Sequence, residues 1–127
     1  MANILVVDDS KFVAKALTTV LGRFGHNVVA HGSDGYEGFE LFKTHQPDLT
    51  LLDITMPNRD GRDCLLDIIQ HDSNAKVIMI SAIKEQEIVD FCLEQGARGF
   101  IEKPLQVGNP EYMEAFSGKL TNILEAR

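Results

Sequence analysis

Three aspartates, one serine and one lysine follow short apolar runs at widely separated places in the sequence: Asp8, Asp9, Asp53, Ser81 and Lys103. Carboxylate oxygens are good ligands for Mg²⁺, which typically binds a few carboxylates together with water and phosphate oxygens. An aspartate can also attack phosphorus and form an aspartyl phosphate, and a lysine and a hydroxyl can stabilise the phosphoryl oxygens. These residue types therefore predict phosphoryl transfer at a Mg²⁺ site, provided that the fold brings them together.

The three carboxylates would repel one another at close range, and this repulsion itself indicates a cation. If they lie within about 5 Å, each like-charge pair costs about 3 kcal/mol at an effective dielectric constant near 20. A divalent cation with oxygen ligands would compensate for that cost. Zinc does not fit, because the histidines lack the spacing of a ligand set, and we expect all four at the surface: His26, His31, His45 and His71.

The hydropathy pattern reveals the elements that must position these residues. Continuous short apolar runs are typical of strands buried on both faces, and they predict strands over residues 4–7, 28–30, 49–52, 77–80 and 99–101. The segments between them carry apolar residues at helical spacing, most clearly between Val13 and Phe24. Asp34 is expected to cap the second helix, and Asn109 followed by Pro110 is expected to begin the last.

Five strands that alternate with five helices predict an α/β fold, with a five-stranded parallel sheet, helices on both faces and right-handed crossovers. In such sheets the ligand site lies beyond the carboxyl ends of the strands. The three aspartates, Ser81 and Lys103 should therefore share one edge. Lys103 is expected about 10 Å away, across two strand spacings, and only its long stem could close part of that gap. Its alternative role is a salt bridge to one of the aspartates, which could become a phosphate contact.

Length and charge limit the organisation of the chain. The 127 residues predict one domain over residues 1–127. The net charge of -7 excludes a basic footprint over the whole domain, so direct binding to nucleic acid is not expected. Cys64 and Cys92 are expected to be reduced thiols of a cytoplasmic protein. No apolar run approaches the length that a membrane-spanning helix needs.

Four segments together resemble the receiver domain of bacterial two-component response regulators: Asp8-Asp9-Ser10, Asp53 to Pro57 followed by Asp60-Gly61, Ser81-Ala82, and Lys103-Pro104. The resemblance covers the chain in order and spacing through Pro104, and the last helix more loosely. It implies the flavodoxin-like doubly wound fold with strand order 2-1-3-4-5. It also implies a cis peptide bond between Lys103 and Pro104.

The resemblance implies a role for each site residue. Asp53 would accept the phosphoryl group, and Asp8, Asp9, Asp53 and the backbone carbonyl of Thr55 would hold Mg²⁺, with Asp8 acting through water. Lys103 and Ser81 would contact the phosphoryl group. Ser81 and Phe100 would form the switch pair that changes a partner-binding face on the fourth helix, fifth strand and fifth helix.

The chain ends at Arg127, so the expected protein is a stand-alone receiver: a signalling module rather than an enzyme, and a monomer or weak dimer. It would be phosphorylated by a sensor histidine kinase or a phosphotransfer protein and would act through a downstream protein target. One alternative is a phosphate sink or phosphorelay intermediate without a dedicated effector. Others are a flavodoxin-like nucleotide binder, which the carboxylates after the first strand disfavour, and a receiver that never accepts phosphate.

Overall fold

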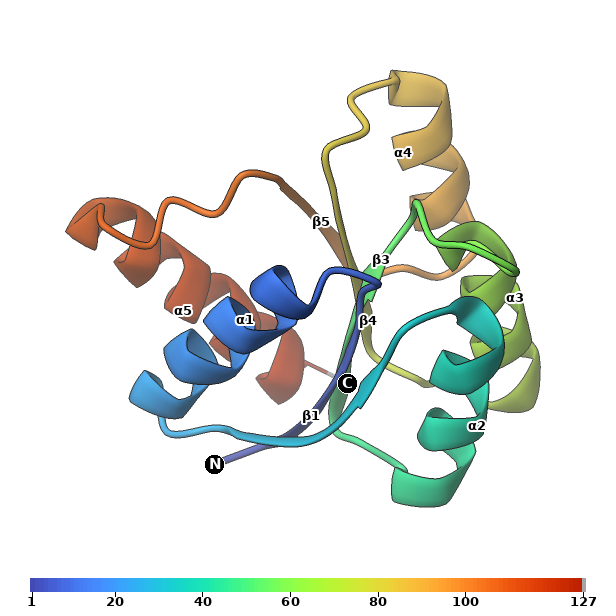
Figure 1. The fold of residues 1–127 in the computed structure, drawn as a ribbon, viewed down its shortest axis with the longest axis horizontal. Coiled ribbons are helices and arrows are strands. Elements are labelled where there is room, and N and C mark those ends of the chain that lie inside the picture. The colour runs from blue at the N-terminus through green and yellow to red at the C-terminus, as the bar shows by residue number, and fades with distance from the viewer. Residues whose placement is uncertain (127) are drawn as a thin grey trace.

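The computed structural model describes residues 1–126, in which strands and helices alternate along the chain (Figure 1). The strands are β1 (Asn3–Val7), β2 (Asn27–Gly32), β3 (Leu49–Asp53), β4 (Val77–Ser81) and β5 (Gly99–Glu102). The helices are α1 (Lys11–Arg23), α2 (Gly35–His45), α3 (Gly61–His71), α4 (Gln86–Glu94) and α5 (Pro110–Glu125). The predicted strands all form, and two of them extend far enough to include Asp53 and Ser81.

The five strands form one parallel sheet in the order β2-β1-β3-β4-β5. Both the predicted fold class and the strand order implied by the resemblance are therefore confirmed. β1 lies directly beside β3, with Val7 opposite Leu52. Because the strands are parallel, the residues that follow Val7 and Leu52 emerge at the same edge of the sheet. This register places Asp8 next to Asp53.

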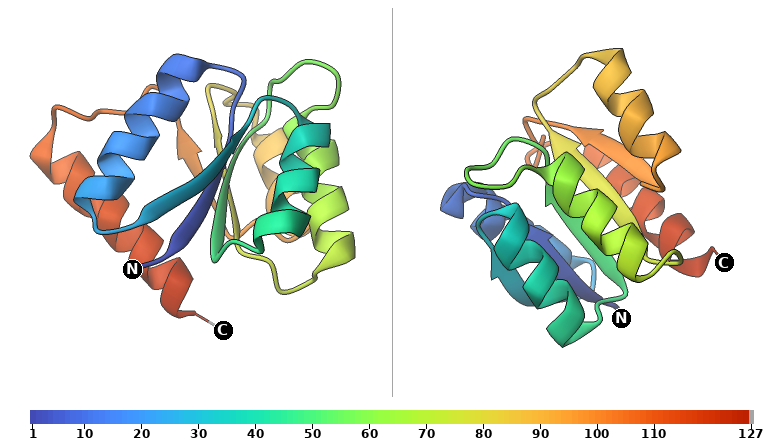
Figure 2. Two further views of the ribbon diagram at one scale, coloured as in Figure 1. Left: turned by 60° about the horizontal axis from the view of Figure 1, so that its bottom comes forward. Right: turned by 90° about the vertical axis from the view of Figure 1, so that its right-hand side faces the viewer.

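Helices cover both faces of the sheet (Figure 2). One face packs against α1 and α5, with a core of buried side chains that includes Leu17, Leu51 and Phe116. The other packs against α2, α3 and α4, with a core that includes Leu52, Leu65 and Cys92. The central strands β3 and β4 are buried along their whole length, which explains their continuous apolar runs.

Side-chain caps fix where most helices begin. Asp34 accepts a hydrogen bond from the Glu37 N–H at the start of α2, and Asn109 accepts from two backbone N–H groups at the start of α5. Both predicted caps are confirmed. Ser10 caps α1 by accepting from the Val13 N–H, directly after the acidic pair. The cap thus fixes the direction in which the chain leaves Asp8.

The histidine prediction is correct for two residues and wrong for two. His45 and His71 are exposed, whereas His26 and His31 are half-buried and hydrogen-bonded. His26 Nδ1 accepts from the Ala2 N–H at 3.1 Å. The sequence pattern does not reveal these hydrogen bonds, because the partner of each histidine lies in a distant part of the chain.

Cys64 and Cys92 are both buried and free. Among residues 1–126, no helix is long and apolar enough to cross a membrane.

Candidate functional site

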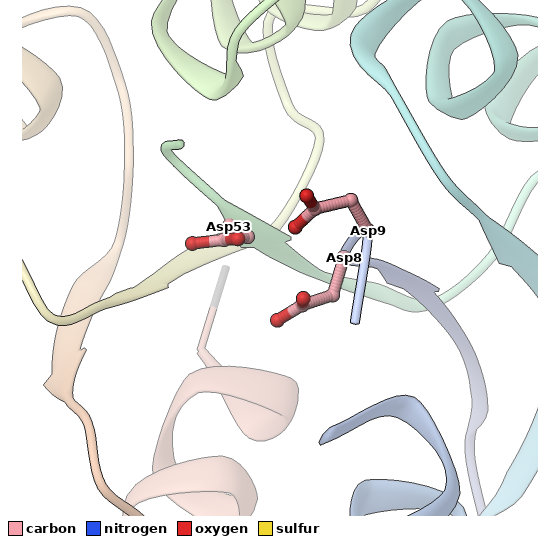
Figure 3. A group of neighbouring side chains, drawn as sticks. All are labelled: Asp8, Asp9 and Asp53. Atoms are coloured by element: carbon pink, nitrogen blue, oxygen red, sulfur yellow. The ribbon is translucent and has the colours of Figure 1, made fainter. Parts of the chain in front are cut away.

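The three aspartates converge at the carboxyl edge of the sheet, as predicted (Figure 3). Asp53 ends β3, and Asp8 and Asp9 directly follow β1. One carboxylate oxygen from each residue lies within 4.8 Å of the others. Asp8 and Asp53 are buried, whereas Asp9 is exposed. The cluster therefore has an open side at Asp9 and a floor formed by two carboxylates shielded from water.

Lys103 supplies the positive charge nearest to these carboxylates. Its Nζ lies 2.7 Å from Asp8 Oδ2 and 3.5 Å from Asp53 Oδ2. The expected salt bridge between Lys103 and an aspartate is therefore present. Asp53 ends the second strand from β5 and Asp8 follows the third, and the long stem of the half-buried Lys103 reaches both carboxylates. The peptide bond between Lys103 and Pro104 is cis, as the resemblance implies.

Burial and the Asp8 charge together disfavour the ionised form of Asp53. They raise its pKa to about 6 from 3.8, against the opposing effect of the Lys103 ammonium. Burial is the largest cause, and Asp8 is the second. Near neutral pH the carboxylate is ionised but is held at an energetic cost. A cation bound beside it would remove that cost.

Ser81 and Phe100 lie on the two strands beyond β3. Ser81 is buried at the end of β4, and its Oγ accepts a hydrogen bond from the Ile83 N–H at 3.1 Å. Phe100 is half-buried in β5 and packs against the core on the α2, α3 and α4 side. Thr55 follows Asp53 in the loop before α3, and its side chain is exposed. Only its backbone carbonyl is expected to serve the site.

The sequence reasoning missed the residues of β2 that hold Asp8. The Asp8 N–H donates to the Gly32 carbonyl at 2.9 Å, and His31 Nε2 lies 2.8 Å from the Asp8 carbonyl oxygen, to which it donates. Both main-chain groups of Asp8 are thus fixed by β2. A histidine inside a strand next to the acidic strand was the available signal, but its position was interpreted as surface.

The donor set of this site consists of oxygens. Three carboxylates and one loop carbonyl match the preference of Mg²⁺ for a few carboxylates in addition to water. Within residues 1–126, this is the one group of three or more acidic, histidine or cysteine side chains close enough to share a metal ion. Two of its members are buried, and buried charges of like sign need compensation. The residues present therefore fit a magnesium ion.

Comparison with known proteins agrees with this geometry. Residues 4–111 match the response regulator receiver domain family. The chemotaxis protein CheY of Bacillus subtilis is 42% identical over 104 residues, covering 82% of this chain and 87% of that protein. CheY of Treponema pallidum is 44% identical over 105 residues, covering 81% of this chain and 73% of that protein.

A solved structure extends the similarity to nearly the whole chain. A chain from the CheX-CheY-BeF3-Mg²⁺ complex of Borrelia burgdorferi aligns with a TM-score of 0.89 and 38% identity, covering 98% of this chain and 90% of that one. The fold, the carboxylates at the sheet edge and these similarities agree with one another. The chain therefore belongs to the response regulator receiver domain family and is a CheY-like receiver of two-component signalling.

Proposed function

We propose that this protein is a single-domain response regulator in which Asp53 accepts a phosphoryl group from a histidine kinase or a phosphotransfer protein. The observation that carries the proposal is the crowding of three carboxylates within 4.8 Å, with the Lys103 ammonium in contact with two of them. Such crowding of like charges has an electrostatic cost, which a sheet edge with no role beyond folding would avoid. It suits a nucleophile that is kept ionised while a dianionic group is transferred to it.

Each residue has a defined part in the transfer. An Asp53 carboxylate oxygen attacks phosphorus as the bond between phosphorus and the donor's imidazole nitrogen breaks, so the phosphoryl group passes from histidine to aspartate. Asp9, Asp53 and the Thr55 carbonyl would hold Mg²⁺ directly, and Asp8 would hold it through water. The bound ion would neutralise charge on the phosphoryl oxygens. Lys103, already 3.5 Å from Asp53, would shift its contact to a phosphoryl oxygen.

Phosphorylation would then be read out through Ser81 and Phe100. In the present structure the Ser81 hydroxyl accepts from the Ile83 N–H, and its proton is available to a phosphoryl oxygen on the neighbouring strand. Movement of Ser81 toward Asp53 would leave space that Phe100, at the border of the core, can fill. The face formed by α4, β5 and α5 would change shape.

A groove already marks this face. It runs between β5 and α5 and is lined by residues that include Phe100, Tyr112, Phe116 and Lys119. Lys119 Nζ donates to the Phe100 carbonyl at 3.1 Å, so the groove is connected directly to the proposed switch residue. A downstream protein target that binds here would sense the position of Phe100. Such a protein acts as a phosphorylation-controlled binding module rather than as a metabolic enzyme.

Phosphorylation by a small phosphodonor tests this function. Incubation with acetyl phosphate and Mg²⁺ is expected to add one phosphoryl group by intact mass, and Asp53→Asn is expected to abolish the addition. Asp48→Asn is the matched control, because Asp48 lies just before β3 at the opposite edge of the sheet and accepts from the Asn3 N–H. It should be phosphorylated like the wild type. An unmodified wild-type protein, or an Asp53→Asn variant that still gains the group, would refute the proposal.

A further inference from the structure

The corner between β2 and α2, residues 31–35, contacts the first of two segments that carry the proposed metal ligands. His31 and Gly32 bind both main-chain groups of Asp8, at 2.8 Å and 2.9 Å. These contacts fix the position of the main chain at the carboxyl end of β1. Asp9, the exposed carboxylate of the cluster, follows in the next position.

The same corner also contacts the second segment, the loop between β3 and α3 that contains Thr55. Asn58 Nδ2 donates to Asp34 Oδ2 at 2.9 Å, and the Gly35 N–H donates to the Arg59 carbonyl at 2.8 Å. A Cβ atom on Gly35 would lie 2.6 Å from that carbonyl oxygen, so the two backbones are in direct contact. The corner therefore touches both metal-binding segments, although it contributes no ligand itself.

Asp34 makes two different contacts with its two carboxylate oxygens. Oδ1 accepts from the Glu37 N–H and caps α2, while Oδ2 accepts from the Asn58 amide. These two hydrogen bonds, the cap first, lower the pKa of Asp34 below its ordinary value. One side chain thus joins the start of a helix to the tip of a loop.

The loop is held at its base and at its tip. The Gly61 N–H donates to the Ile54 carbonyl at 2.8 Å, which closes the base. Asn58 adopts φ 67°, a left-handed conformation that asparagine tolerates better than most residues, and this turn aims its amide at Asp34. Thr55 lies between these two fixed points. The contacts at the tip and at the base thus both limit the positions that its carbonyl can take.

We propose that Asp34 and Asn58 are positioning residues for the magnesium site: their hydrogen bond sets the place of the Thr55 carbonyl relative to Asp9 and thereby sets the affinity for Mg²⁺. This inference rests on the proposed function. Mg²⁺ demands near-ideal octahedral geometry, and a backbone carbonyl cannot adjust by a change of rotamer as a carboxylate can. The placement of the loop therefore matters more for this ligand than for the three aspartates.

Two single variants remove the contact in different ways. Asn58→Gly deletes the amide and keeps the left-handed conformation without strain. Asp34→Ser keeps the cap of α2, since serine caps as well as aspartate, but it has no second oxygen to accept the hydrogen bond from the Asn58 amide. Partners of metal ligands typically change affinity by about 10- to 100-fold. Because Asn58 is exposed, we expect each variant to weaken Mg²⁺ binding by about 3- to 10-fold in calorimetric titration.

A double variant that exchanges the two residues is the decisive test of whether their hydrogen bond sets the Mg²⁺ affinity. The double variant Asp34→Asn with Asn58→Asp reverses donor and acceptor, conserves net charge and is expected to bind Mg²⁺ within about twofold of the wild type. Glu37→Gln is the matched control, because it removes a carboxylate from the same turn of α2 without touching Asn58. Its Mg²⁺ affinity should be unchanged. Glu37→Gln should also be phosphorylated by acetyl phosphate as fast as the wild type.

The outcomes separate this inference from the proposed function. A wild type that binds Mg²⁺ and gains a phosphoryl group, with single variants of equal Mg²⁺ affinity, would overturn the inference and leave the function standing. Weakened binding in the single variants that the exchange does not recover would also overturn it, because the loss would then come from general damage to the loop. A wild type that binds no Mg²⁺ would refute both.

Discussion

Asp53 combines two requirements that oppose each other at the scale of a single residue. A nucleophile must be ionised, but burial and the charge of Asp8 raise the pKa of Asp53 to about 6. Lys103 lowers it again, although not to its ordinary value. In the absence of a metal ion the folded protein therefore carries an energetic penalty near neutral pH. This penalty would remain until a bound cation relieved it.

Replacement of Asp53 by asparagine should therefore stabilise the metal-free protein at neutral pH. Between pH 3.8 and about 6 the folded state keeps a proton on Asp53 that the unfolded state has lost, so stability falls as the pH rises through this range. Above it, Asp53→Asn should raise the free energy of unfolding by about 1–2 kcal/mol, after allowance for solvent screening. The gain should disappear as the pH approaches 4.

Urea unfolding in EDTA at a series of pH values measures this difference. The wild type at each pH is the reference, and Asp48→Asn, at the other edge of the sheet, controls for the loss of one negative charge. A gain in stability that is equally large at pH 4 and pH 7.5 would show that packing rather than ionisation causes it.

Thr50 is a polar side chain inside the sheet that no part of the proposed function uses. It is fully buried in β3, and its Oγ1 has no hydrogen-bond partner within the described residues. A buried hydroxyl without a partner costs about 1–3 kcal/mol. Thr50→Val, which keeps the shape, is expected to raise the free energy of unfolding by about 1 kcal/mol in urea denaturation. The exposed Thr44→Val should change it by less than about 0.5 kcal/mol, and a destabilised Thr50→Val would contradict the expectation.

At the scale of elements, the strength of the sequence signal follows burial. The central strands β3 and β4 are buried at every position and produce clear apolar runs. The outer strands β2 and β5 are each fully buried at one position, and their apolar runs are shorter and mixed with polar residues. The predicted range 28–30 therefore covers only the middle of β2, Asn27–Gly32. The polar end of β2, where His31 and Gly32 contact Asp8, was not predicted as part of the strand. The hydropathy pattern of a strand does not show which residues of the neighbouring strand it contacts.

Helix α4 has the weakest anchoring of the helices. Its N-cap Glu85 makes no side-chain hydrogen bond to the described first turn, and Cys92 is its one buried residue. Lys84 and Glu85, which precede the helix, are exposed. An element with little buried surface changes position at low cost. This agrees with a role for α4 in the face that the proposed switch would remodel.

Substitution by alanine is expected to have opposite effects on stability at two glycines, one inside α5 and one at the start of α3. Gly118 lies exposed inside α5, and an added Cβ would meet no described atom within 4 Å, so Gly118→Ala should stabilise the protein by about 0.5–1 kcal/mol. Gly61 begins α3, and a Cβ there would overlap the Asp53 carbonyl oxygen. Gly61→Ala should destabilise by more than about 2 kcal/mol. Thermal unfolding of the pair tests this, and equal shifts of the two variants would contradict it.

At the scale of the whole molecule, the site exists only because the chain order of the strands differs from their spatial order. β1 lies between β2 and β3, so Asp8 and Asp53 become neighbours. The sequence predicted this convergence because parallel strands present their carboxyl ends at one edge. It did not predict the contact between Asn58 and Asp34, since hydrogen bonds between two loops follow no periodicity. The convergence of the three carboxylates was thus predictable, and the contact between the two loops beside them was not.

Occupation of this site by Mg²⁺ should stabilise the molecule as a whole. Three carboxylates close together are available only in the folded state, so an ion that binds them shifts the folding equilibrium by mass action. Above the dissociation constant, each tenfold increase in Mg²⁺ should add about 1.4 kcal/mol, which raises the melting temperature of a domain of this size by about 5 °C. Scanning calorimetry over a Mg²⁺ series, with NaCl at matched ionic strength as the control, measures the slope. Asp9→Asn should flatten it, and a wild-type melting temperature that responds equally to NaCl would show that screening of surface charge, rather than a bound ion, stabilises the fold.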